Sequence, residues 1–241
     1  MKHVMITSGA KGIGRAVTER LLKEGWFVSV LQRNPIDWTH ERLHMVEAEL
    51  TDRQTLLQGY ELAVERFGEP DALILNAGPY IFERKSMVEL SDEEWDEVMT
   101  GNLSASFWLM RRAIPAMRSK QFGRIITYGF PESANAPGWL HRSVFAAAKS
   151  GLVSLTKSVA LEEAPYGITV NMVNPGNIVG SQKEMRIEDA ESDDQTPVGR
   201  HGTGEDIARM ITFLLSEDSD MITGAVIDVT GGVNVVHQYR K

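Results

Sequence analysis

Short apolar runs alternate with longer amphipathic stretches from one end of this chain to the other. The runs lie at Val4–Thr7, Phe27–Leu31, Leu73–Leu75, Ile125–Tyr128, Thr169–Val173 and Ala225–Val229. They are continuous rather than alternating in polarity, which is typical of parallel strands buried on both faces. The stretches between them predict helices at Ile13–Glu24, Arg53–Phe67, Glu93–Arg118, Phe145–Glu163 and Glu205–Ser216. This order predicts an α/β fold, a doubly wound parallel sheet of the Rossmann type, with ligands at the carboxyl ends of the strands.

The length favours one domain over residues 1–241, because 241 residues with 42% hydrophobic content can bury one large core. The one shift in composition is Gly180–Thr196, which is rich in Glu, Asp, Ser and Gln. Charge alone favours a solvated surface loop for this segment. Its position, just after a Pro-Gly at a strand end, leaves a substrate lid as the alternative.

Charge and composition exclude several classes of function. The 25 basic and 33 acidic side chains give a net charge of −8 without a basic cluster, so we expect no nucleic-acid partner. The chain has no cysteine, hence no disulfide, thiolate ligand or cysteine nucleophile. No segment approaches the ~18 continuous apolar residues of a membrane span. We therefore expect a cytoplasmic protein that has no membrane partner.

A glycine-rich loop follows the first predicted strand and opens the first predicted helix. It reads Thr7-Ser8-Gly9-Ala10-Lys11-Gly12-Ile13-Gly14. Glycines permit a tight turn there, and the backbone N–H groups can reach a pyrophosphate that also meets the positive end of the helix dipole. The glycines alone are a weak signal, but the strand before and the helix after supply the required context. We expect the cofactor to be held here by Thr7, Gly9, Lys11, Gly12, Ile13 and Gly14.

The end of the second strand predicts which dinucleotide binds. An NAD site usually has an acidic residue there for the ribose 2′-hydroxyl, whereas an arginine accommodates a 2′-phosphate. This chain has Arg33 at that point, and Lys11 adds a second cation. Each could be an ordinary surface charge, but two cations without an opposing acid favour NADP(H) over NAD(H).

Several further motifs stand in a fixed order along the chain. They are Leu75-Asn76-Ala77-Gly78, Asn102, Lys149, Asn174-Pro175-Gly176, Pro197-Val198-Gly199-Arg200, Glu205-Asp206-Ile207-Ala208, Ile222-Thr223-Gly224 and Gly231-Gly232. Together with the loop, they resemble the short-chain dehydrogenase/reductase family over nearly the whole chain. The C-terminal motifs look most like those of 3-oxoacyl-acyl-carrier-protein reductases.

The resemblance implies a role for each matching position in a cofactor cleft. The adenosine ribose would be lined by Asn76, Ala77 and Gly78, the adenine by Glu49 and Leu50, and the nicotinamide by Pro175, Gly176 and Ile178. The family often has threonine at the position of Gly180, so we expect one cofactor contact to be lost or passed to Ser181.

The resemblance breaks at the groups that carry the chemistry. Family members have Tyr-x-x-x-Lys on one helix, where the tyrosine transfers a proton and the lysine holds the nicotinamide ribose. This chain has Phe145 four residues before Lys149, and its Phe130 stands near where the family's serine would follow the strand. Asn102 and Lys149 are the catalytic candidates that remain in register. Positioned acid–base groups contribute about 10²–10⁴-fold each, so we expect a weakened site.

Other polar residues could in principle replace the missing donor, although each has a simpler explanation as a strand, loop or cap residue. They are Tyr80, Tyr128, Glu132, His141 and Ser143. Ser133 is a separate candidate, for the place of the family's serine, if the insertion around Pro131–Pro137 folds back toward the site. His40 and His44 have the spacing of two ligands on one helical face, but no third ligand accompanies them, and we expect no metal site. The broad apolar surface around Phe107–Met110 indicates a homo-oligomer, a tetramer in the family, although a thick monomer core would look the same.

Three functions fit these features. The first is an NADP(H)-dependent oxidoreductase with an altered proton donor, acting on a small-molecule or acyl-carrier carbonyl or an activated alkene. The second is a cofactor-binding pseudoenzyme that senses the dinucleotide, and the third is a structural subunit. The intact loop, Arg33 and Lys149 argue against the third, because packing alone does not require them. We favour the first.

Overall fold

The computed structural model describes residues 2–76 and 78–233. Its core is a parallel sheet of seven strands in the order β3-β2-β1-β4-β5-β6-β7. The strands are β1 (His3–Thr7), β2 (Phe27–Gln32), β3 (Leu43–Glu47), β4 (Ala72–Leu75), β5 (Gly123–Tyr128), β6 (Ile168–Pro175) and β7 (Val226–Val229). The predicted doubly wound α/β fold is confirmed.

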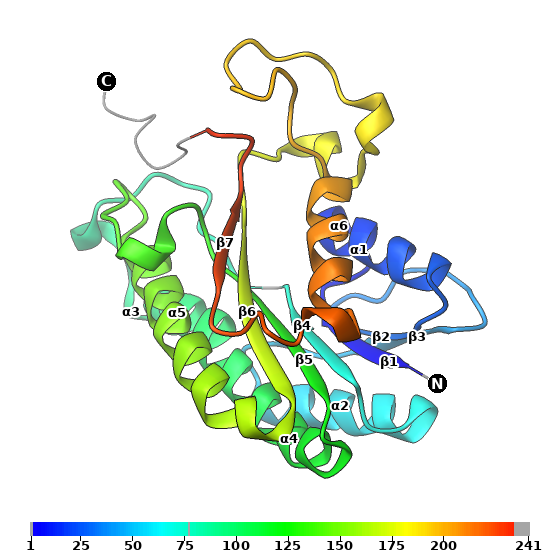
Figure 1. The fold of residues 1–241 in the computed structure, drawn as a ribbon. Helices are drawn as coiled ribbons and strands as arrows, with labels where there is room; N and C mark the ends of the chain where they lie inside the picture. The colour runs from blue at the N-terminus through cyan, green and yellow to red at the C-terminus, as the bar shows by residue number, and fades with distance from the viewer. Residues whose placement is uncertain (1, 77, 234–241) are drawn as a thin grey trace.

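Helices cover both faces of the sheet, as Figure 1 shows. One face carries α1 (Gly12–Lys23) and α6 (Gly204–Leu214), and the other carries α2 (Arg53–Phe67), α4 (Ala105–Lys120) and α5 (Ser143–Glu163). Successive side chains of a strand point to opposite faces. Val4 and Ile6 therefore join the core under α1 and α6, while Met5 joins the core on the other side.

The strand order reverses between β1 and β4, because β2 and β3 lie on one side of β1 and the later strands on the other. In open sheets of this kind the loops at the carboxyl ends separate at the reversal and leave a crevice for a ligand. The loops after β1, β2, β4, β5 and β6 all reach that edge. The candidate site therefore lies there.

Strand β3 was not predicted from the sequence, and because of it His40 and His44 do not share a helical face. His44 lies in this strand and pairs with Ser29 of β2, while His40 precedes it in a loop. The strand was missed because it is a short edge strand, in which a polar histidine interrupts the apolar run. Within the described part of the chain, no group of three or more metal-ligating side chains comes together.

The helix predicted over 93–118 is a longer run with an interruption. Helix α3 (Asp92–Met99) is followed by one turn of π-helix, η2 (Thr100–Ser104), and then by α4. Ser91 caps the run as expected, since its Oγ accepts from the Glu94 N–H at 3.2 Å. The wide turn contains the buried Asn102, and such turns often mark functional sites. The other predicted elements are correct to within one or two residues at each end.

Helix α5 and the turn after it, Ser143–Tyr166, are long and apolar enough to meet a length-and-composition test for a membrane span. Val159 and Ala160 of this helix pack with Val170 of β6 in the core. A core helix passes the same test, so the finding is weak evidence for a membrane segment.

Candidate functional site

The glycine-rich loop after β1 is packed too tightly for side chains at two of its glycines. A Cβ on Gly9 would lie 2.6 Å from Ile6 Cγ2, and one on Gly14 would lie 2.3 Å from the Ser8 carbonyl oxygen. Gly12 has a φ of +59°, and among the described residues a Cβ there would approach only the flexible side chain of Lys183. Since glycine alone adopts this backbone freely, the loop can bring its N–H groups close to an anion at the start of α1.

Asn76 ties the loop after β4 to the loop after β1. Its Nδ2 donates to the Thr7 carbonyl oxygen at 3.0 Å and to the Ser8 carbonyl oxygen at 3.2 Å. Next in the loop, Gly78 leaves room for Asn102, whose Oδ1 would lie 2.0 Å from a Cβ there. Asn102 donates in turn to the Pro79 carbonyl oxygen at 2.9 Å. Hydrogen bonds from Asn76 and Asn102 thus hold the loop at the expected ribose position. Ala77, the third predicted ribose contact, lies outside the described residues.

A cavity of about 130 Å³ opens beside this loop. Its lining brings together three predicted parts of an adenosine site, namely the ribose contact Gly78, the adenine contacts Glu49 and Leu50, and Arg33 at the end of β2. Gln32, just before Arg33, accepts from the Ala10 N–H at 3.2 Å and so joins β2 to the glycine-rich loop. These residues come from separate loops, and their convergence fits an adenosine.

The expectation that no acid opposes Arg33 is wrong. Its Nε lies 3.5 Å from Glu49 Oε2, and the Arg33 side chain is 70% exposed. Glu49 follows β3, the strand that was not predicted, and the pairing of β3 with β2 brings the carboxylate to the arginine. Exposed ion pairs contribute about 0–1 kcal/mol, so Arg33 is held only weakly and can turn toward another anion.

Lys149 lies buried on α5, where its Nζ is 5.6 Å from the centroid of the Phe145 ring. No hydrogen bond or ion pair joins this ammonium to residues 2–76 or 78–233. Burial lowers its pKa from 10.5 to about 8. A buried ammonium without partners is costly, and the hydroxyl groups of a nicotinamide ribose are the partners that the family resemblance implies.

Four rings gather where the family would have its hydroxyl groups, and we name them the aromatic cluster: Tyr80, Phe130, Trp139 and Phe145. The Phe130 and Trp139 centroids are 5.1 Å apart, and those of Tyr80 and Phe145 are 4.9 Å apart, edge to face. Phe130 is buried, while Phe145 and Trp139 are half-buried. The residue of the cluster that faces Lys149 is Phe145, which presents a ring and no hydroxyl.

The candidates for the missing hydroxyl groups lie in different surroundings. Ser133 Oγ accepts from Asn174 Nδ2 at 3.0 Å, so its hydroxyl is engaged away from the aromatic cluster. Tyr128 belongs to the core under α1 and α6, and burial raises the pKa of its phenol. Tyr80 does lie in the cluster, and its hydroxyl accepts from Arg142 Nε at 2.5 Å.

The other three candidates lie along the segment that leads from β5 into α5. Glu132 and His141 adopt left-handed backbone, with φ of 65° and 61°, and Ser143 is the exposed first residue of α5. Backbone of this kind costs about 1–3 kcal/mol per residue and clusters at functional sites. His141 and Ser143 line a small cavity together with Phe145. Tyr80 is the candidate donor whose ring packs directly on the Phe145 ring.

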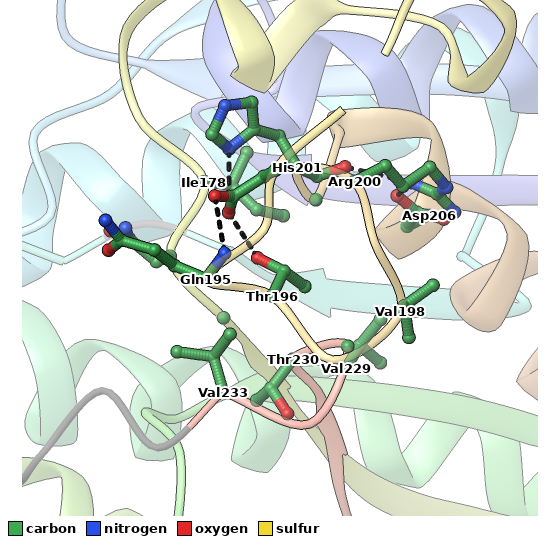
Figure 2. A pocket seen from close by; sticks show the side chains of 15 residues that line it. Ile178, Gln195, Thr196, Val198, Arg200, His201, Asp206, Val229, Thr230 and Val233 are labelled. Carbon is green, nitrogen blue, oxygen red and sulfur yellow. Dashed lines mark hydrogen bonds and ion pairs between the residues drawn. The ribbon is translucent and has the colours of Figure 1, made fainter. Parts of the chain in front are cut away.

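The predicted nicotinamide contacts follow β6. Gly176 donates its N–H to the Val229 carbonyl oxygen at 2.9 Å, and a Cβ there would lie 2.7 Å from Thr230 Cα. Ile178 is buried, and with Gly176 it lines a cavity of about 230 Å³. Figure 2 shows this cavity between the strand end at Val229 and the segment carrying Thr196 and Val198.

Residues 180–196, which we name the acidic segment, lie beyond the carboxyl ends of the strands, in yellow near the tops of α1 and α6 in Figure 1. They form two short turns of 3₁₀-helix, η5 (Gly180–Glu184) and η6 (Ile187–Asp189). Gly180 has a φ of +53° with open space around it, and Ser181 is exposed.

One residue of the acidic segment was missed as a site residue. Glu184 Oε1 accepts from the Gly12 N–H at 2.7 Å, across 172 positions of sequence. Its other oxygen lies 4.0 Å from Arg15 Nε. A carboxylate thus rests on the N-terminus of α1, which the sequence predicts as the pyrophosphate position. Only local composition marked this segment, so no sequence signal pointed to the contact.

The chain is similar to known reductases along almost its entire length. The family model described as "Enoyl-(Acyl carrier protein) reductase" matches residues 9–234. The Bacillus subtilis protein named "Putative oxidoreductase YtkK" is 53% identical, over 99% of this chain and 98% of the relative. The "3-oxoacyl-[acyl-carrier-protein] reductase FabG" of Haemophilus influenzae is 34% identical, over 96% of this chain and 98% of the relative.

Two solved structures share the fold. A structure named "putative 3-oxoacyl-reductase from bacillus thuringiensis" superposes with a TM-score of 0.92 at 51% identity, covering 98% of this chain and 100% of the other. A 3-ketoacyl-(acyl-carrier-protein) reductase from Brucella melitensis, complexed with NADH, superposes with a TM-score of 0.83 at 26% identity, covering 96% and 97%. Together with the sheet order and the motifs in register, these findings place the chain in the short-chain dehydrogenase/reductase family, among oxidoreductases related to the 3-oxoacyl-acyl-carrier-protein reductases.

Proposed function

We propose that this protein is an NADP(H)-dependent oxidoreductase that acts on a carbonyl, 3-oxoacyl-like or related, and that its site reduces ordinary ketones poorly. The observation that carries the proposal is Lys149, a buried ammonium without a described partner at the carboxyl edge of the sheet. The tight glycine-rich loop and the cavity beside Arg33 support the same cofactor. A nicotinamide cofactor is also named in the complex of the Brucella relative.

Each residue would contribute to binding or orientation. The reduced cofactor, when bound, would supply a hydride. Lys149 would hold the nicotinamide ribose, Gly176 and Ile178 would back the nicotinamide, and Asn102 would keep the loop after β4 in place. Phe145 and Phe130 would exclude water from the hydride path without offering a proton, and that is why the reduction of a simple ketone should be slow.

The alternative is a cofactor-binding pseudoenzyme with a sensing or regulatory role. The aromatic cluster favours it, since the rings replace the hydroxyl groups on which the family's chemistry depends. The Glu184 contact also fits such a role, because it links cofactor binding to the position of the acidic segment. The two functions differ in turnover and not in cofactor binding.

We further propose a homotetramer in the cytoplasm, with no nucleic-acid or membrane partner. A cavity of about 480 Å³ between α4 and α5 is lined by Leu103, Trp108 and Leu155 and by Phe107, which is 42% exposed. An open apolar groove of this kind is typical of a subunit interface, and light scattering at micromolar concentration tests it. The acidic segment would act as the substrate lid.

Arg33 should determine cofactor preference. We expect the native protein to bind NADPH more tightly than NADH. Arg33→Asp should lower the affinity for NADPH at least tenfold and leave the affinity for NADH unchanged, because a charge-assisted pair with the 2′-phosphate is lost. Calorimetric titration measures both affinities. Glu49→Gln is the matched control. It removes the competing carboxylate 3.5 Å from Arg33 and should raise the affinity for NADPH. Equal affinity of the native protein for the two cofactors would contradict the assignment.

Lys149 should lower stability while serving the cofactor. Its pKa is about 8 in the folded protein and 10.5 in an unfolded chain, so between these values the unfolded chain binds more protons and stability rises with pH. Below pH 8 the burial cost is fully present, about 3 kcal/mol at 1.36 kcal/mol per pKa unit. Lys149→Met should therefore be more stable than native protein to urea at pH 7.

The advantage of Lys149→Met over the native protein should shrink as the pH rises from 8 toward 10, and the variant should bind NADPH more weakly at every pH. Urea titrations at several pH values, paired with calorimetry, give both quantities. A stability difference that does not change with pH would show that the lysine titrates normally.

Glu184 should compete with the cofactor for the N-terminus of α1. Glu184→Gln keeps the size of the side chain but removes its charge, and we expect NADPH affinity to rise about twofold to fivefold, the range of a helix-dipole interaction of ~0.3–1 kcal/mol. Glu188→Gln is the control, because the Glu188 carboxylate pairs with Arg186 on the exposed surface. Unchanged or weaker binding in Glu184→Gln would mean that the carboxylate does not oppose the pyrophosphate.

Phe145→Tyr should restore carbonyl reduction. We expect native protein to reduce an acetoacetyl thioester only slightly above background and Phe145→Tyr to do so about 10²-fold faster, the lower end of what a positioned acid contributes. The absorbance of NADPH follows the reaction. Phe145→Leu, which adds no hydroxyl, should give no gain. Fast turnover by the native protein would refute the weakened site and point to Tyr80 as the donor.

A further inference from the structure

We propose that the hydride acceptor of this site is a planar quinone that lies against the aromatic cluster, an inference that rests on the oxidoreductase function proposed above. A quinone suits this site because its reduction needs no acid from the protein. The argument has three parts: the shape of the cluster, the basicity of the product and the charge of the groups around it.

The cluster offers ring surface next to Lys149, the residue expected to hold the nicotinamide ribose. Trp139 lies 5.1 Å from Phe130 and 6.1 Å from Phe145, measured between ring centroids. Phe145 begins the helical turn that carries Lys149, and both Phe145 and Trp139 are half-buried, so part of each ring remains open. Aromatic pairs prefer centroid separations of about 4.5–7 Å, and a flat ring system can add to this cluster by the same packing.

The basicity of the product decides which acceptor can react without an acid. Hydride addition to a ketone gives an alkoxide, which is about as basic as hydroxide. The conjugate acid of hydroxide is water, with a pKa of about 15.7. Hydride addition to a quinone gives a hydroquinone monoanion, a phenolate whose conjugate acid has a pKa of about 10, as for tyrosine. The alkoxide must be protonated as it forms, whereas the phenolate can leave the site as an anion.

The step is balanced without a protein donor. The C–H bond of the reduced nicotinamide breaks, its electron pair and hydrogen pass to the quinone, and one O–H bond forms while the other oxygen becomes a phenolate. Water protonates the phenolate after release. The quinone is reduced by two electrons and the nicotinamide is oxidised by two, so the protein contributes binding surface and charge.

The nearby charges favour an anionic product and disfavour a cationic acceptor such as an iminium ion, which also needs no acid. The Lys149 ammonium lies 5.6 Å from the Phe145 centroid, and the Arg142 guanidinium carbon lies 4.9 Å from the Tyr80 centroid. Both would repel a cation and stabilise a phenolate. Among the acceptors that need no proton, the charges therefore select the one whose product is negative.

The experiment compares menadione with tetralone, a ketone with a similar pair of fused rings. Native protein with NADPH should turn over menadione at least 10²-fold faster than tetralone. Calorimetry with protein free of cofactor should detect menadione binding, and Trp139→Leu should weaken it about twofold to tenfold, the range expected for one lost aromatic contact. Phe213→Leu, an exposed aromatic on α6, is the control and should leave binding unchanged.

The outcomes separate this inference from the function on which it rests. Failure to bind NADPH would overturn the proposed oxidoreductase function and the inference together. NADPH binding without menadione binding or reduction would overturn the inference alone. Loss of menadione reduction in Tyr80→Phe, with its binding retained, would also overturn the inference, because it would show that the reaction needs a protein acid. Reduction that survives Tyr80→Phe supports it.

Discussion

The side-chain amide of Asn76 holds together the two loops between which the sheet opens. Its two hydrogen bonds to the carbonyl oxygens of Thr7 and Ser8 join the carboxyl ends of β1 and β4, the point where the strand order reverses. Position 14 must be glycine for the amide to fit, because a Cβ there would lie 2.7 Å from Asn76 Nδ2. The junction thus fixes the glycine-rich loop, which leads into α1, against the loop after β4.

At the start of α5 a buried cation lies beside aromatic rings. Lys149 stays buried although burial lowers its pKa to about 8, and Phe145 one helical turn earlier provides a ring face in place of a hydrogen bond. An aromatic face attracts an ammonium by about 0.5–2 kcal/mol, which offsets only part of the burial cost. The geometry therefore suits a ligand whose polar atoms bind Lys149 and whose reacting atom lies against the aromatic rings.

The acidic segment connects the end of β6 with the start of α1. It leaves β6 next to Ile178, whose side chain lines the cavity shown in Figure 2, and it returns to α1 through Glu184. Four residues after the segment, Arg200 makes two hydrogen bonds to the Asp206 carboxylate, 2.7 and 2.8 Å long, which fix this part of the chain at the start of α6. The Glu184 contacts are one exposed hydrogen bond to Gly12 and a 4.0 Å ion pair with Arg15, which an anion can replace.

The sequence by itself determined the alternation of strands and helices, the doubly wound sheet, the glycine-rich loop and the absence of a hydroxyl at Phe145 and Phe130, because these depend on residue type and local spacing. It did not determine contacts between distant segments. Edge strand β3 had too weak a pattern to be recognised, and with it the Glu49 carboxylate beside Arg33 was missed. The Glu184 contact and the assignment of Ser133, Tyr128 and Tyr80 to separate surroundings depend on which face each segment turns to its neighbours, and only the tertiary structure decided that.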